Sequence, residues 1–164
     1  MVRPAGFEQR VYVLPAVAHM EAPSSQELGA GVEITGDLPA PINFSGTTNF
    51  IDVSDISDRQ DKNQVGTISL DNLEFEIYRD KSDQVAYDAL ENETDYFLVK
   101  FEGLGTTEPD ADDICDVAAV TIGIKSDVSS ARNESRRVTI PAGIRSAVAW
   151  NAVLDGSVAS SSSA

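Results

Sequence analysis

The chain has few of the residues from which most active sites and metal centres are built. Its 164 residues include one cysteine, Cys115, and one histidine, His19. A single cysteine excludes an internal disulfide and a cysteine-rich metal site, and a lone histidine without such partners does not complete a zinc site. The neighbours of Cys115, Ile114 and Asp116, should raise the pKa of its thiol. We therefore expect an inert cysteine, no metal and no cofactor.

Positive charge is also scarce. Twelve lysines and arginines stand against 27 aspartates and glutamates, which gives a formal net charge of -15 and a pI of about 4.2. Tight binding to nucleic-acid phosphates or to anionic lipid requires basic residues, so the balance argues against both. No apolar run is long enough to span a membrane, and "VYVLPAVA" (11–18) is short and broken by Pro15. We expect a soluble protein that is made in a cytoplasm.

Alternation of apolar and polar residues predicts a mainly β fold. In "LEFEIYRD" (73–80), three apolar residues alternate with Glu74, Glu76 and Tyr78, which indicates a strand with one buried and one polar face. Comparable runs predict strands at 31–36, 65–80 in two parts, 95–103, 117–128 and 136–154, with a short one beginning at 50, while 11–18 is either a strand or part of an N-terminal arm. A short helix is predicted over 82–92, capped by Ser82 or Asp83. These elements favour a β-sandwich or open barrel with one short flanking helix.

Three segments do not fit this pattern. Residues 1–30 form a mixed N-terminal arm, and residues 157–164 form a flexible serine-rich tail. Residues 37–64 are rich in turn residues and carry an aspartate at every third position from Asp52 to Asp61, so we expect a long loop, which in a compact domain is usually functional or disordered. The domain then covers 31–156. We expect its single core to contain Phe97, Phe101, Val120, Ile122, Ile124 and Trp150.

No segment has the pattern of a catalytic or ligand-binding motif. The acidic loop around Asp110 lacks the glycine and the glutamate of a calcium loop, because Cys115 and Thr121 occupy those positions. "GLGTT" (103–107) lacks the lysine of a phosphate-binding loop. Glu74 and Glu76 can in principle serve a glycosidase, but on a strand they are more often the solvated face. We predict that the protein is not an enzyme.

The order of the elements carries a resemblance. The strand pair "VGTISLDNLEFEIYRD" leads into the helix "SDQVAYDAL" and the strand "TDYFLVKFEG"; an acidic loop then leads to "DVAAVTIGIKSD", and "RNESRRVTIPAG" follows. Over roughly residues 31–154 the chain resembles the tail tube protein, or major tail protein, of long-tailed bacteriophages.

The resemblance implies a structural virion protein. In that family, six copies form a ring whose strands join edge to edge into a barrel, and the rings stack into a tail tube through which viral DNA passes. The arm 1–30 and the loop 37–64 would reach between subunits or rings. The partners would be further copies, the tape measure, tail tip and terminator proteins, and DNA in transit, with no membrane binding. The protein would be located in the virion tail, which would be assembled in the host cytoplasm.

The resemblance also gives the acidic balance a purpose. A lumen lined with carboxylates repels the phosphates of DNA, so the duplex slides; the same alternation equally suits an outer surface. The lumen-facing candidates are Glu74, Glu76, Asp52 and Asp55. Charge pairs between copies can set register and orientation, and the candidates for them are Asp58, Asp61, Arg79, Arg132, Arg136, Arg137 and Arg145.

Two alternatives stay open. One is another ring protein of a phage tail or contractile injection device, such as a tail terminator or a connector. The other is an unrelated β-sandwich binding module, for instance an adhesin or a carbohydrate binder, which would be expected to expose aromatic residues on a solvated face. An enzyme ranks third.

Overall fold

The computed structural model describes residues 9–57, 59–79, 84–104, 108–128, 132 and 136–155. The mainly β fold is confirmed, with two short α-helices and a 3-10 helix where one helix was expected. In chain order the elements are β1 (Arg10–Leu14), α1 (Ser25–Ala30), β2 (Val32–Glu33), η1 (Thr35–Asp37), β3 (Gly46–Asp52), β4 (Asn63–Leu70), β5 (Leu73–Tyr78), α2 (Val85–Ala89), β6 (Asp95–Phe101), β7 (Ile114–Ile122), β8 (Ser126–Val128) and β9 (Arg137–Val153). No helix in these residues is long and apolar enough to cross a membrane.

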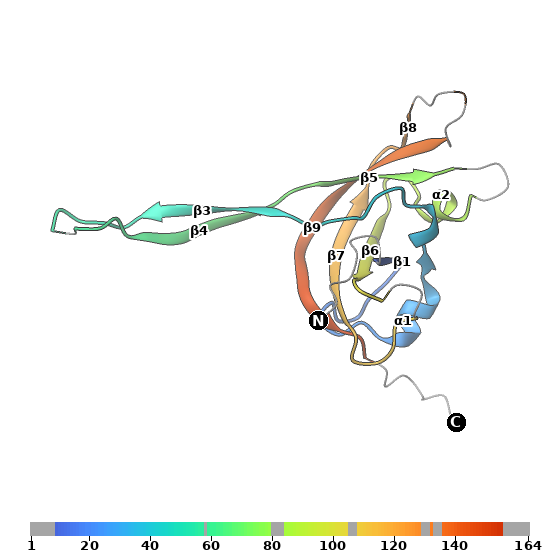
Figure 1. Cartoon of the computed structure of the whole chain (residues 1–164), viewed down its shortest axis with the longest axis horizontal. Helices are drawn as coiled ribbons and strands as arrows, with labels where there is room; N and C mark the ends of the chain where they lie inside the picture. Colours follow the sequence, from blue (N-terminus) through green and yellow to red (C-terminus); the bar gives the residue numbers. More distant parts are fainter. Residues whose placement is uncertain are drawn as a thin grey trace.

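One curved, seven-stranded antiparallel sheet forms the body (Figure 1). Its strand order is β2-β1-β6-β7-β9-β5, with β8 beside the start of β9. The long strand β9 pairs with β5 through its first six residues and with β7 from Ala142 onward. Two register shifts between β7 and β9 mark bulges, and bulges bend a strand. The bent β9 therefore gives the sheet its open-barrel curvature.

The core lies on both faces of this sheet, in two clusters. Neighbouring residues of a strand face opposite sides, so on β6 Leu98 belongs to one cluster and Val99 to the other. Ile34, Ile42, Phe44 and α2 cover the first cluster, while Leu28 of α1 packs against the second.

The predicted single core is therefore wrong. Val120 and Ile122 lie in the first cluster, whereas Phe101 lies in the second and Phe97 packs against it. Ile124 is 67% exposed because β7 ends at Ile122, and Trp150 is 52% exposed in the irregular part of β9.

The segment around residues 37–64 holds a hairpin and is not a loop throughout. β3 and β4 form a separate two-stranded sheet that projects far from the body (Figure 1). β-Branched residues such as Thr48, Ile51 and Val65 favour the extended strand conformation of this hairpin. The alternation is hard to see in the sequence because the register shifts between Thr48 and Phe50.

The N-terminal segment contributes a strand to the body. β1 lies between β2 and β6, and Val11, Val13 and Leu14 are buried, so residues 10–14 belong to the domain and not to an arm. The predicted strand 31–36 shortens to β2, and η1 follows it. Residues 1–8 and 157–164, with the helix caps proposed at Ser82 and Asp83, lie outside the described residues.

The first helix, α1, was not predicted. It begins with a capping box, in which the Ser24 hydroxyl accepts from the Glu27 amide at 3.1 Å and the Glu27 carboxylate accepts from the Ser24 amide at 2.9 Å. The signal for this helix is the spacing Ser-x-x-Glu in "SSQE".

Candidate functional site

The hairpin carries an exposed apolar surface that a bulge creates. Thr48 pairs with Ile68 and Phe50 pairs with Val65, so β4 advances three residues while β3 advances two. Paired residues share a face, and Thr48 and Phe50 share one because they are two apart. Ile68 and Val65, three apart, would face opposite sides of a regular strand. The extra residue in β4 therefore places Phe50, Val65 and Ile68 on one face, which we name the hairpin stripe.

All three residues of the hairpin stripe are more than half exposed. An apolar strip on a projecting two-stranded ribbon has no internal core to cover it, and such exposed surface typically marks contact with another chain. The opposite face differs, because it carries Ile51 packed over Gly66; a Cβ at Gly66 would lie 2.9 Å from Ile51 Cγ1.

The far end of the hairpin is acidic. Asp52 accepts a hydrogen bond from the Ser54 amide at 2.8 Å, and Asp55 accepts from the hydroxyl and amide of Ser57 at 2.6 Å each. These bonds lower the pKa of both carboxyls, so both are ionised at neutral pH. Asp61, which follows in the same segment of the sequence, is exposed. Asp58 lies outside the described residues.

A second candidate surface is the edge of β9. At Ala142, β9 pairs with Leu73 of β5 on one side and with Ile122 of β7 on the other. Beyond this point, among the strands that the structure describes, only β7 pairs with β9 as far as Val153. Between Gly143 and Ala152, the side left vacant by β5 faces no other strand of the described chain and can accept an additional strand, whereas at Val153 the backbone amide donates to the Glu21 carbonyl at 3.2 Å. Trp150 lies in this part of β9, with its ring edge-on to Phe44 at 6.3 Å.

The four lumen candidates do not form one surface within a single chain. Glu74 and Glu76 lie on the polar face of β5, since Leu73, Phe75 and Ile77 are buried in the first cluster. Glu74 is exposed, whereas Glu76 is partly buried and its carboxylate lies 3.1 Å from Arg137 Nη1. Asp52 and Asp55 belong instead to the hairpin, away from the body (Figure 1).

Most of the basic candidates have acidic or aromatic partners within the chain. Arg136 pairs with Asp127 at 3.3 Å, Arg137 with Glu76 as above, and Arg145 with Asp95 at 3.6 Å. The guanidinium of Arg79 lies 3.9 Å from the centre of the Tyr87 ring, which Lys125 Nζ also approaches to 4.0 Å. Arg132 is exposed.

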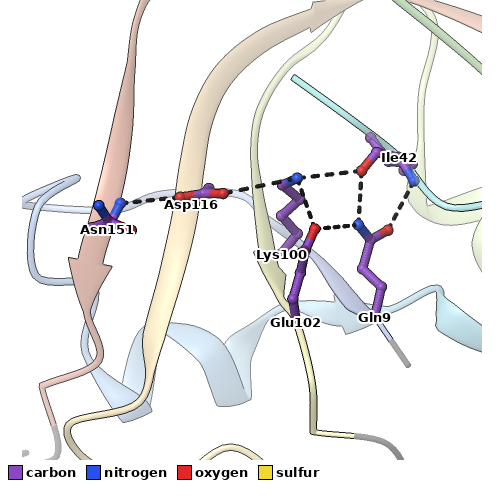
Figure 2. Close-up of polar contacts among 6 residues, drawn as sticks. All are labelled: Gln9, Ile42, Lys100, Glu102, Asp116 and Asn151. Atoms are coloured by element: carbon purple, nitrogen blue, oxygen red, sulfur yellow. Dashed lines mark hydrogen bonds and ion pairs between the residues drawn. The ribbon is translucent and has the colours of Figure 1, made fainter. Parts of the chain in front are cut away.

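A buried lysine, which the sequence analysis did not identify, lies where the hairpin segment meets the sheet (Figure 2). Lys100 on β6 is 6% exposed, and its Nζ lies 3.1 Å from Glu102 Oε1 and 3.8 Å from Asp116 Oδ2. Lys100 Nζ also donates to the Ile42 carbonyl at 3.5 Å. Hydrogen bonding to Lys100 lowers the pKa of Glu102. The sequence signal is the lysine within the apolar run "FLVKF".

Gln9 and Asn151 extend this cluster. The Gln9 side chain donates to the Ile42 carbonyl and accepts from the Ile42 amide, both at 2.8 Å, and it donates to Glu102 at 3.2 Å. At the other end, the backbone amide of Asn151, in the bulged part of β9, donates to Asp116 Oδ1 at 3.0 Å. We name these residues the root cluster: Gln9, Ile42, Lys100, Glu102, Asp116 and Asn151.

The described part of the chain shows how its metal-ligand residue types and its cysteine are placed. No group of three or more histidine, cysteine, aspartate or glutamate side chains there is arranged to hold a metal ion. Cys115 is buried, and burial together with Asp116 raises the pKa of its thiol to about 12, in the direction expected from its neighbours.

Comparison with known proteins identifies a family by sequence and a similar overall fold by structure. The sequence profile of one family, described as phage tail tube protein, matches residues 5–156. A search of the curated proteins found no match. Among solved structures, a chain of the 6-fold symmetrised cryo-EM structure of the anti-feeding prophage (AFP) baseplate has a similar fold, with a TM-score of 0.60 and 9% identity over 90% of this chain and 97% of that chain.

Proposed function

The chain belongs to the phage tail tube protein family, and on that basis we propose that six copies form a ring, that the rings stack into a tube, and that viral DNA leaves the virion through it. The family is one of structural proteins, and membership in it implies a location in the virion tail. The observation that carries the proposal is the β3–β4 hairpin, which leaves the body with its apolar stripe uncovered. A domain that works alone gains nothing from such an extension.

The open edge of β9 supports ring formation. A strand from the next copy can pair with β9 where β5 leaves it free. Repeated head to tail, this contact joins different surfaces of neighbouring copies, and such contacts generate rings when the rotation closes. A closed ring leaves no strand edge open to further pairing. The tube would assemble in the host cytoplasm with the tape measure, tail tip and terminator proteins as partners.

We expect the hairpin stripe to be buried between copies, and substitutions on the two hairpin faces test this. Phe50→Ser should raise the protein concentration needed for tube formation about ten-fold or more, since burying such a side chain contributes about 1.5–3 kcal/mol and each 1.4 kcal/mol is a factor of about ten. Ile51→Ser, on the opposite face at similar exposure, is the matched control. Sedimentation and negative-stain microscopy measure both; equal effects would show that the stripe is not the contact.

The proposed lumen charge is tested at Glu74, because Glu76 is engaged with Arg137. Phage tubes that carry Glu74→Lys should assemble but eject DNA more slowly, most clearly at low salt, because repulsion reaches only about 8 Å at physiological ionic strength. Glu21→Lys makes the same charge change at an exposed position before α1. If both variants eject DNA at the wild-type rate at every salt concentration, Glu74 does not face the lumen.

A second function is favoured by the structural similarity. The similar chain belongs to a baseplate, so a ring at the end of a tube is the alternative to the tube itself. Negative-stain images of the purified protein distinguish the two, because only a tube protein should form long stacks without a partner.

A further inference from the structure

The root cluster joins parts of the chain that are distant in sequence. Gln9 precedes β1, Ile42 lies four residues before β3, and Lys100 belongs to β6 in the middle of the sheet. The side chains of Gln9 and Lys100 meet at the backbone carbonyl of Ile42, which accepts a hydrogen bond from each of them (Figure 2). A carbonyl oxygen has two lone pairs, so both acceptor positions are used.

The hairpin is attached to the body through two roots. At one root, β4 continues after two residues into β5, which is held by β9. A single strand allows rotation about its own axis, so this root alone leaves the direction of the hairpin undefined. At the other root, the Gln9 side chain bonds both backbone groups of Ile42, as a neighbouring strand would. The roots are also linked to each other, because the Asp71 amide donates to the Ser45 carbonyl at 2.9 Å.

Burying a lysine is an expensive way to gain stability. Desolvation of a buried charge offsets much of its attraction to nearby carboxylates, and apolar side chains of similar volume often stabilise a protein equally well. Directed polar contacts differ from apolar ones in that they fix orientation. Phe44, two residues after Ile42, extends this effect toward the hairpin, since its ring lies 5.1 Å from Lys100 Nζ and packs against Trp150.

We propose that Gln9 and Lys100 are positioning residues that set the direction of the β3–β4 hairpin relative to the sheet. Each copy then presents its hairpin stripe to a neighbour in the same orientation. The consequence for assembly rests on the proposed function, but the positioning itself is a property of the single chain and can be measured before any tube forms.

The test measures hairpin direction in the monomer. Spin labels are placed at Gln64→Cys on β4 and Ser126→Cys on β8, both exposed, in a chain that carries Cys115→Ala. The unaltered root cluster should give one narrow distance distribution. Gln9→Met and Lys100→Met should each broaden it, and the double substitution should abolish the single peak.

The control is a loss of stability away from the hairpin. Val117→Ala, in the second core cluster, removes buried methyl groups and should lower the free energy of unfolding without altering the distances. Gln9→Met leaves every charge in place, so it tests the positioning even if Lys100→Met fails to fold. A narrow, unshifted distribution in folded Gln9→Met and Lys100→Met proteins would overturn the inference. Absence of tubes from the parent chain would instead count against the proposed function alone.

Discussion

Tubes will not form when residues 47–69 are replaced by Asn-Gly, although the rest of the chain will fold. Gly46 pairs with Leu70, so a two-residue turn can close the shortened hairpin there. Every residue of β3 and most of β4 are exposed, so little buried surface is lost. Leu70, which packs against the first core cluster, is kept.

Two measurements on the shortened chain check this expectation. Thermal unfolding should keep a cooperative transition close to that of the full chain, while negative-stain images should show no tubes at any concentration at which the full chain polymerises. Tubes of the usual diameter from the shortened chain would show that the hairpin does not connect copies. Loss of the cooperative transition would show that the hairpin supports the domain itself.

Phe101→Ala should lower the free energy of unfolding by about 3–5 kcal/mol, the usual cost of removing a buried phenylalanine. Phe101 is fully buried in the second core cluster and meets the Tyr12 ring edge-on at a centroid distance of 6.0 Å. Denaturant unfolding measures the loss. A cost below about 1 kcal/mol would mean that the second cluster is not a true core.

Trp150→Ala provides the contrast. Trp150 is half exposed and has Phe44 as its ring partner, so its removal should cost about 1 kcal/mol or less in the same measurement. Tryptophan is enriched among residues that dominate binding energy, so the variant should polymerise poorly while remaining stable. A cost as large as that of Phe101→Ala would contradict the exposed position.

Much of the sheet could be predicted because its strands follow simple periodic patterns. Alternation in "LEFEIY" gives β5 with its buried face, and Asp71 and Asn72 mark the break between β4 and β5. The bulges could not be predicted, because an extra residue is defined by its partner strand and leaves no pattern of its own. For that reason the sequence predicts a long loop where β3 lies and a core position for Trp150, although it predicts most of β4 as a strand.

The candidate surfaces were predictable only in part. The acidic face of β5 follows directly from alternation, and the resemblance drew attention to the region that contains the hairpin. The root cluster was out of reach, since Gln9 and Lys100 lie 33 and 58 residues from Ile42 and meet it only in the folded chain. Sequence spacing says nothing of contacts between such distant positions.

The partly covered edge of β9 has a consequence for accuracy of assembly. An edge of uniform length lets an added strand slide by two residues at little cost, because the same side chains still face the same way. Here the edge is stepped: β5 covers β9 as far as Ala142 and then leaves it open. An incoming strand that slides toward the start of β9 collides with Leu73, where β5 begins. In the proposed ring, the step would act as a mechanical stop that keeps an added strand off the first part of β9 without a dedicated recognition residue.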